Sequence, residues 1–290
     1  MKPGSSIAEG GLALVVLMLT GLPVGAQNSR VTDSYLSNIE LCNGTGTTSF
    51  DARIGACTTF IQARPDSRAA LAIAYNNRGS AYTAKGDYDS AIRDFDQSIA
   101  LNPTYAKAFN NRGVAHLRRR EYELAIEAFD DAIKLDPGYG AAFVNRAGAY
   151  LKKNDHQRAA HDYDEAIRLQ PASQAAWSGR CWTRAVLGAS REALADCDRA
   201  LQSGSTSAVY DSRGLIHLKM GEFGAAIDDY NSALRAAPEL ASALFGRGLA
   251  KLKQGDAIGG KSDISTAKTI QKNIDDEFAR YGVDTTELTW

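Results

Sequence analysis

The sequence lacks most of the features that would give it an obvious chemistry. Its 33 basic and 34 acidic residues leave a formal net charge of -1, so it has no basic surplus of the kind that binds nucleic acid or anionic membranes. It contains no C-x-x-C, G-x-S-x-G or H-E-x-x-H motif, the patterns of redox, hydrolase and zinc-protease sites. The sequence therefore predicts no catalytic residue, no cofactor and no metal site, and we expect a protein that is not an enzyme.

A long apolar run is also missing, except near the start of the chain. Residues 11–26 read GLALVVLMLTGLPVGA and follow a short positive start at Lys2. The run is short for a membrane span of about 20 residues and is interrupted by glycine and proline, while Val24 and Ala26 form a small-residue cleavage site. We therefore predict a signal peptide over residues 1–26, a mature chain without a membrane span, and export to the periplasm or beyond the cell.

Proline is scarce, with seven residues in the chain, but its spacing is regular. An internal repeat of about 34 residues explains the regularity. The same period separates a set of arginines in similar surroundings, namely Arg78, Arg112, Arg146, Arg180, Arg213 and Arg247. The prolines that accompany them are Pro103, Pro137, Pro171 and Pro238.

Each repeat divides into two amphipathic helices around a turn. In the first repeat, Gly86 can adopt the left-handed conformation that ends a helix. Ala91, Phe95 and Ile99 then form an apolar stripe at helical spacing, and Pro103 stops the second helix because proline cannot donate to the previous turn. One such hairpin cannot bury its own stripe, so the repeats must stack.

These units resemble the tetratricopeptide repeat (TPR) family, whose pattern places an aromatic residue, small-x-x-aromatic, A-x-x-x-F and a closing proline every 34 residues. The fourth unit departs from it at Cys181, Arg184 and Cys197, and the sixth at Leu244 and Gly260 among others. The resemblance implies an all-α fold, an α-solenoid of TPR hairpins that forms a right-handed superhelix with a concave groove. We expect a degenerate hairpin over residues 27–70, six repeats over 71–267, and a capping helix with a tail over 268–290.

The four cysteines, Cys42, Cys57, Cys181 and Cys197, allow three pairings. In an antiparallel hairpin, residues equidistant from the turn face each other. Cys181 and Cys197 are equidistant from the turn of the fourth repeat, and Cys42 and Cys57 flank a turn in the same way. We therefore predict the disulfides 42–57 and 181–197, as structural links rather than redox sites.

The repeated arginines have repeated acidic partners in the sequence. Asp96, Asp130, Asp164 and Asp198 recur eighteen residues after the arginines of the first four units, and Asn231 and Ser265 take this position in the last two. A residue that repeats belongs to the architecture. We therefore expect ion pairs within hairpins or between neighbouring repeats.

One short segment matches a nucleotide-binding motif by sequence. Residues 255–262 read GDAIGGKS and fit G-x-x-x-x-G-K-[ST], the phosphate-binding loop. That loop follows a β-strand, whereas the segment before it has helical spacing. In register with the repeats, Gly255 is a turn glycine and Gly260 replaces a packing alanine. We therefore predict a second helix that is weakened by glycine and frayed where the solenoid ends.

The resemblance also implies where a ligand would bind, because TPR domains contact ligands with certain positions of each first helix. In the C-terminal half these positions carry apolar side chains, namely Trp182, Leu215, Leu218, Phe245, Leu249 and Leu252. In the N-terminal half they are more polar, with Asn76, Asn110, Lys107 and Arg118. The first set suits an amphipathic helix or peptide, unless the C-terminal helix fills the groove or some of these side chains pack between repeats. The second set suits backbone or acidic contacts.

The sequence thus predicts a protein–protein interaction scaffold that binds a peptide or helix in its concave groove, in a bacterial envelope. The alternative is a regulatory or assembly subunit of an envelope enzyme complex, such as one that acts on the cell wall. Partners are expected to be proteins or peptides, and not nucleic acid.

Overall fold

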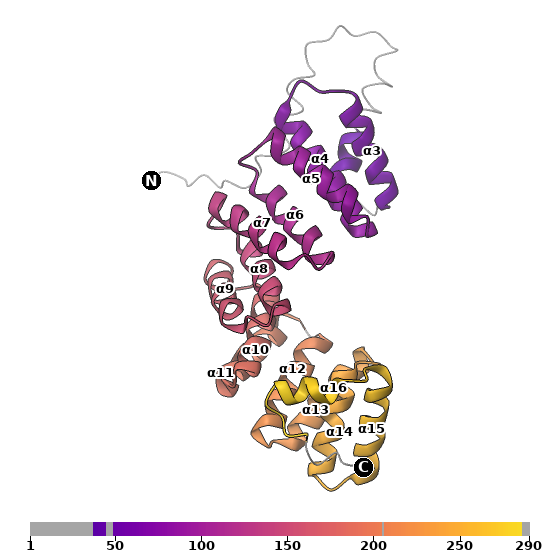
Figure 1. Ribbon diagram of the computed structural model, residues 1–290, viewed down its shortest axis with the longest axis vertical. Helices are drawn as coiled ribbons and strands as arrows, with labels where there is room; N and C mark the ends of the chain where they lie inside the picture. Colours follow the sequence, from indigo (N-terminus) through magenta and orange to yellow (C-terminus); the bar gives the residue numbers. More distant parts are fainter. Residues whose placement is uncertain (1–36, 45–48, 205, 286–290) are drawn as a thin grey trace, which may run out of the picture. The chain divides into compact units, whose positions relative to one another are not determined.

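The computed structural model describes residues 37–44, 49–204 and 206–285 (Figure 1). The predicted signal peptide, residues 1–26, lies outside the described residues. Every regular element of the described residues is a helix, and no strand occurs among them. The chain divides into two compact units, Met1–Glu121 and Tyr122–Trp290, which we call unit 1 and unit 2.

Unit 1 is built from consecutive antiparallel helices. Residues 37–43 are helical. They are followed by α3 (Phe50–Gln62), α4 (Arg68–Lys85), α5 (Tyr88–Leu101) and α6 (Ala106–Arg118). Each of the helices α3 to α5 packs against the next one in the chain, and α4 also contacts α6. The contact between α4 and α6 aligns the first helices of neighbouring repeats, so their side chains form one continuous surface.

Unit 2 repeats the same arrangement over a longer stretch. Its helices are α7 (Tyr122–Leu135), α8 (Gly140–Lys152), α9 (His156–Leu169), α10 (Gln174–Leu187), α11 (Ser190–Ser203), α12 (Ser207–Met220), α13 (Phe223–Ala236), α14 (Ala241–Lys253), α15 (Ala257–Ile270) and α16 (Ile274–Arg280). Consecutive helices pack in pairs, and the first helices α8, α10, α12 and α14 contact one another in order. The predicted all-α solenoid of helical hairpins is therefore confirmed.

The turns inside the hairpins require a left-handed residue. Gly86 ends α4 with φ 84°, as predicted. The equivalent residues of the next two repeats are not glycine, yet Arg120 and Asn154 adopt φ 64° and φ 58°. A side chain in this region costs about 1 kcal/mol or more, so the stacking of the repeats holds these two turns against local strain.

The segment that matches the phosphate-binding loop is an ordinary hairpin turn. It follows the helix α14, Gly255 is left-handed with φ 91°, and the Asp256 side chain caps α15 by accepting from the N–H of Gly259 at 2.9 Å. The prediction of a frayed helix is wrong, because α15 is continuous over 14 residues. A Cβ at Gly260 would lie 2.8 Å from the carbonyl oxygen of Gly248, so the glycines allow a close approach of α14 and α15 that compensates for their weak helix propensity.

Candidate functional site

Charged pairs join the first helix of a repeat to its own second helix and to that of the preceding repeat, and Arg146 illustrates the arrangement. Its Nε and Nη2 donate to the two carboxylate oxygens of Asp162 at 2.8 and 2.7 Å, and its Nη1 donates to Asp130 at 2.6 Å. Asp162 lies in the paired second helix α9, whereas Asp130 lies in α7 of the preceding repeat. The expected ion pairs of the recurring aspartates are confirmed as pairs between neighbouring repeats, and Arg146 adds a pair within its hairpin.

The sequence analysis named only the outer aspartates, each of which pairs with the arginine of the following repeat. The inner partner follows the arginine by sixteen residues and is buried, as in Asp94, Asp162, Asp196, Asp229 and Asp263. Its recurrence at a fixed spacing was a signal that could have revealed it. In the second repeat the position holds Ala128. Each inner carboxylate receives two parallel hydrogen bonds from its guanidinium, a geometry that fixes orientation as well as charge.

Asparagine side chains form a chain of hydrogen bonds along the first helices of unit 1. Nδ2 of Asn111 donates to Oδ1 of Asn76 at 2.9 Å, and Nδ2 of Asn76 donates to Oδ1 of Asn77 at 3.3 Å. Asn77 in turn donates to Oδ1 of Asn43 at 3.1 Å, and Asn110 donates to Asn111 at 3.3 Å. We call these five residues the asparagine ladder. It joins the 37–43 helix, α4 and α6 across one face of unit 1.

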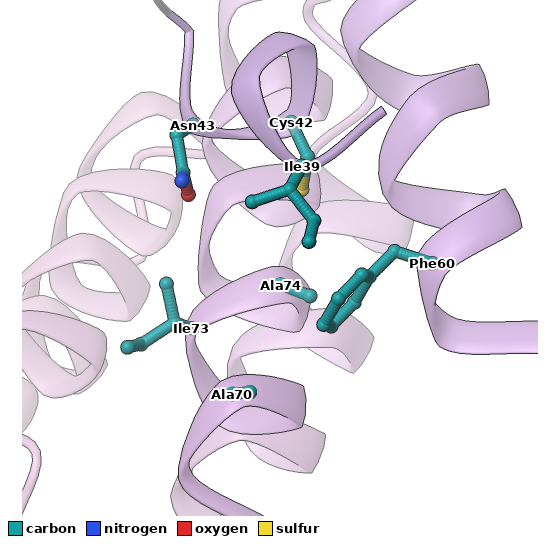
Figure 2. Close-up of a pocket in the computed structure, with 7 residues that line it drawn as sticks. All are labelled: Ile39, Cys42, Asn43, Phe60, Ala70, Ile73 and Ala74. Atoms are coloured by element: carbon teal, nitrogen blue, oxygen red, sulfur yellow. The ribbon is translucent and has the colours of Figure 1, made fainter. Parts of the chain in front are cut away.

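An apolar pocket adjoins the ladder where Asn43 is shared by both (Figure 2). It is a cavity of about 60 Å³ between the 37–43 helix, α3 and α4. Ile39, Phe60 and Ile73 surround it, together with Ala70 and Ala74. Ile73 is 39% exposed although it is apolar, so the pocket opens on the same side as the ladder.

Of the polar candidates predicted for the N-terminal half, two lie inside the ladder and two outside it. Asn76 and Asn110 are buried, at 0% and 5% exposure. Lys107 and Arg118 are exposed on α6, at positions that share one face of the helix with Asn110. The structure therefore combines buried amides that organise the surface with cations at its edge.

The aromatic residue of the preceding second helix decides where the ladder can continue. Asn111 is the sixth residue of its repeat and follows a repeat with Phe95 at the core position. Where that core residue is tyrosine, the sixth position is glycine: a Cβ at Gly179 would lie 2.5 Å from the hydroxyl of Tyr163, and one at Gly246 would lie 2.3 Å from that of Tyr230. The tyrosine hydroxyl thus takes the space of the asparagine side chain, a pairing that the sequence contains but that we did not predict.

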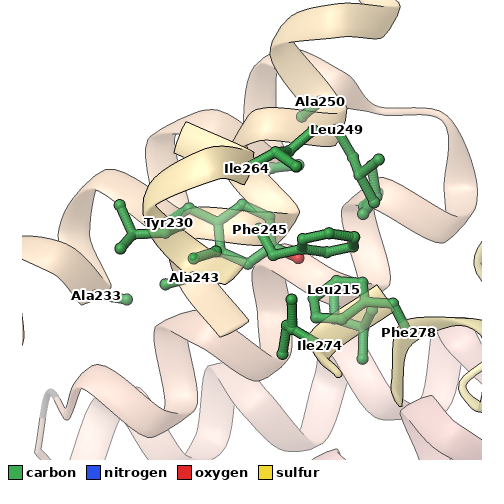
Figure 3. Close-up of a cluster of buried hydrophobic side chains, with 14 of the residues drawn as sticks. Leu215, Tyr230, Ala233, Ala243, Phe245, Leu249, Ala250, Ile264, Ile274 and Phe278 are labelled. Atoms are coloured by element: carbon green, nitrogen blue, oxygen red, sulfur yellow. The ribbon is translucent and has the colours of Figure 1, made fainter. Parts of the chain in front are cut away.

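The apolar candidates of the C-terminal half belong to the hydrophobic cluster that also contains Ile274 and Phe278 of α16 (Figure 3). Leu215, Leu218, Phe245 and Leu249 are at most 7% exposed, and Trp182 and Leu252 pack against them. The ring of Phe245 lies 4.8 Å from that of Phe278, and the ring of Trp182 lies 4.9 Å edge-on from that of Tyr281. Of the arrangements that the sequence left open, the C-terminal segment covers Trp182 and Phe245, whereas Leu252 lies against Gly260 of the neighbouring helix α15.

Acidic groups mark the polar side of this helix. Glu277 accepts hydrogen bonds from the Tyr281 hydroxyl and from Nε2 of Gln271. Asp211 in α12 accepts from the Ser242 hydroxyl at 2.7 Å. Burial raises the pKa of Asp211 to about 7 against the opposing hydrogen bond from Ser242, and the negative charge of Glu277 adds to the rise. Docking of α16 therefore places the carboxylate of Glu277 close enough to Asp211 to affect its ionisation.

The cysteines lie where the hairpin argument put them. Cys42 faces Cys57 in unit 1 with a Cα–Cα distance of 4.7 Å, and Cys181 faces Cys197 between α10 and α11 at 5.2 Å. Both pairs are at disulfide distance, and all four residues are buried. Among the described residues, no cluster of three metal-ligating side chains occurs, and no helix has the length and hydropathy to cross a membrane.

Comparison with known proteins identifies the repeat. The family model of the tetratricopeptide repeat matches residues 76–140, 144–208 and 212–257. Comparison with curated protein sequences returns no match.

Solved structures resemble the chain in fold. A chain of the APC/C hetero-tetramer Cut9–Hcn1 has a TM-score of 0.67 at 14% identity, over 86% of this chain and 52% of the other, so this chain spans about half its length. A tetratricopeptide repeat protein from Parabacteroides merdae has a TM-score of 0.62 at 17% identity, over 86% of this chain and 98% of the other. PilF of Pseudomonas aeruginosa has a TM-score of 0.61 at 16% identity, over 74% and 96%. At these identities the likeness concerns the fold alone.

Proposed function

Because the chain belongs to the tetratricopeptide repeat family, whose fold generally mediates protein–protein interaction, we propose that it is a binding scaffold that holds an extended polypeptide segment on the ladder face of unit 1. The carrying observation is the asparagine ladder beside an open apolar pocket. Proteins with this repeat are typically non-enzymatic. The chemistry of this face is likewise that of recognition, with amides, cations and an apolar cavity side by side.

Amide side chains suit the recognition of a peptide backbone. Each asparagine can donate two hydrogen bonds and accept two, and the bonds inside the ladder orient the amide groups in advance. Asn43 is exposed and Asn77 is partly exposed, so their remaining capacity faces solvent. A ligand that meets pre-oriented amides loses less free energy in ordering them.

The pocket and the cations specify the side chains of the partner. The pocket, lined by Ile39, Phe60 and Ile73, accepts an apolar side chain from the bound segment. Lys107 and Arg118 favour acidic residues further along the segment. The proposed ligand is therefore an extended peptide that carries an apolar anchor and acidic residues.

We further propose that the protein acts after export, in a bacterial envelope. The predicted signal peptide and the two cysteine pairs support this, because disulfides persist in oxidising compartments. Intact mass after alkylation without reductant tests the pairing. The expected result is that none of the four cysteines is alkylated. Four alkylated thiols would contradict both the disulfides and the oxidising compartment.

The binding face is tested by a photo-crosslinking residue at position 73 of the full mature chain, in envelope extract, with position 124 as control. Leu124 is also an exposed apolar residue, at 47% against 39% for Ile73, but it belongs to α7 of unit 2, whereas the ladder belongs to unit 1. We expect a crosslinked protein from position 73 alone. If the captured protein is an enzyme that acts on the cell wall, the scaffold is an assembly subunit of an enzyme complex.

The captured segment is then made as a synthetic peptide and titrated calorimetrically. We expect Ile73→Asp to weaken binding at least tenfold, because a charge would enter the apolar pocket. Lys107→Ala should weaken binding a few-fold, and less so at high salt. Equal capture from both positions, or unchanged affinity for Ile73→Asp, would refute the proposed face.

A further inference from the structure

The C-terminal helix α16 occupies unit 2 in the manner of a ligand. It contributes one face to the groove, where Ile274 is 0% and Phe278 is 2% exposed and Tyr281 packs behind them. Its opposite face, with Asp276, Ala279 and Arg280, is exposed. We propose that the groove of unit 2 is a binding site for an amphipathic helix and that α16 is its built-in occupant, which a partner helix of matching pattern displaces.

The cluster that contains Ile274 and Phe278 of α16 draws its groove side chains from three successive repeats. Trp182 lies on α10, Leu215 and Leu218 on α12, and Phe245 and Leu249 on α14. Phe245 occupies the repeat position that Asn76 and Asn110 have in unit 1, whereas Trp182, Leu215 and Leu249 occupy the position of Ser80 and Val114. A hairpin needs apolar side chains toward its paired helix and its neighbours. Apolar side chains on the side of the helix that faces neither of these are available to a ligand in the groove.

The occupant is separable from the repeats by its size and its connection. It has seven residues, and a helix of that length is not stable in water without its contacts. It follows α15 after a break at residues 271–273 rather than continuing a hairpin. Release of α16 therefore leaves each helical hairpin of unit 2 intact and uncovers an aromatic-lined groove.

The charges at the interface define the partner that competes best. Glu277 of α16 acts on the partly exposed Asp211 with a charge of the same sign, which weakens the docking of α16. A partner helix with a basic residue at that position would pair with Asp211 instead. The matching ligand is therefore an amphipathic helix with apolar or aromatic residues at i, i+4 and i+7 and lysine or arginine at i+3. This inference concerns unit 2 alone and does not rest on the function proposed for unit 1.

The direct test is competition in the full chain. The probe is a fluorescein-labelled peptide of residues 271–285 that carries Glu277→Lys, and its binding is followed by anisotropy. Because α16 is tethered, it competes at a high effective concentration, and the apparent Kd of the peptide rises by a factor of one plus the docking constant of α16. We expect Phe278→Ala in the protein to tighten peptide binding at least tenfold, whereas Arg280→Ala on the exposed face leaves it unchanged. A peptide with Phe278→Ala should not bind.

Hydrogen exchange of the unaltered chain decides the matter even if a variant fails to fold. We expect the amides of α16 to exchange at least a hundredfold faster than those of α14, because α16 opens without unfolding of the repeats. Equal protection of α16 and α14 would overturn the proposal by making α16 part of the indivisible core. Equal peptide affinity of the original chain and Phe278→Ala would overturn it as well. Ile73→Asp in unit 1 should change neither measurement, which separates this inference from the proposed function.

Discussion

Replacing Asp162 by alanine should destabilise unit 2 far more than replacing Asp130, although both carboxylates bind the same guanidinium. Asp162 is 2% exposed and accepts two hydrogen bonds from Arg146, whereas Asp130 is 51% exposed and accepts one. Removal of one partner from a buried pair costs about 3–5 kcal/mol, because it leaves the other charge unpaired. An exposed pair contributes about 0–1 kcal/mol.

The structure sets the expected values more closely. The Arg146 side chain is 17% exposed and keeps Asp130 in the Asp162→Ala variant, so the lower end of the buried range applies. Both substitutions gain up to about 0.7 kcal/mol of helix propensity, because both lie inside helices. We therefore expect a loss of about 3 kcal/mol for Asp162→Ala and a change near zero for Asp130→Ala.

Urea unfolding followed by circular dichroism measures the difference between the two variants. The midpoint should fall for Asp162→Ala with little change in slope, and the melting temperature should fall by roughly 6–12 °C. Salt at 0.5 M should not remove the effect, since a buried pair is weakly screened. Equal destabilisation by the two variants, within about 0.5 kcal/mol, would refute the claim that burial separates the inner aspartate from the outer one.

Three further predictions concern an acid with a raised pKa, a buried hydroxyl and a strained turn. The folded state keeps Asp211 protonated up to its pKa of about 7, while the unfolded carboxyl ionises near 3.9. The free energy of unfolding should therefore fall as the pH rises from about 4 to 7, and urea titrations should show a flatter profile for Asp211→Asn; an equal slope would contradict the assignment. The hydroxyl of Tyr230 is buried without a hydrogen-bond partner among the described residues, so Tyr230→Phe should raise stability by about 1 kcal/mol in the same assay, and a loss would show that the hydroxyl is satisfied. Arg120→Gly should stabilise unit 1 by about 0.5–1 kcal/mol, because Arg120 holds φ 64°, whereas Gly86→Ala should destabilise it; a lower thermal midpoint for Arg120→Gly would contradict the strain.

The local features of the hairpins could be read from the sequence because they depend on short-range rules. The 34-residue period, the glycine at position 86 and the apolar stripe through Phe95 follow from helix periodicity and turn chemistry. The cysteine pairs followed as well, since residues equidistant from a turn must face each other. The same logic found the outer aspartates but missed the inner ones. The spacing of the aspartates shows which of them recur, but it does not show which are buried.

The state of the groove could not be read from the sequence in the same way. Trp182, Leu215 and Phe245 have the same identity whether a partner or the chain's own helix covers them, and the outcome depends on the path of the chain after Ile270. Likewise, Asn76 and Asn111 become a ladder only when stacking brings residues 35 positions apart within 2.9 Å. The sequence by itself determined the repeat and its hairpins through local periodicity. Tertiary structure decided which aspartates are buried and which part of the groove is filled, because these depend on contacts between residues distant in the chain.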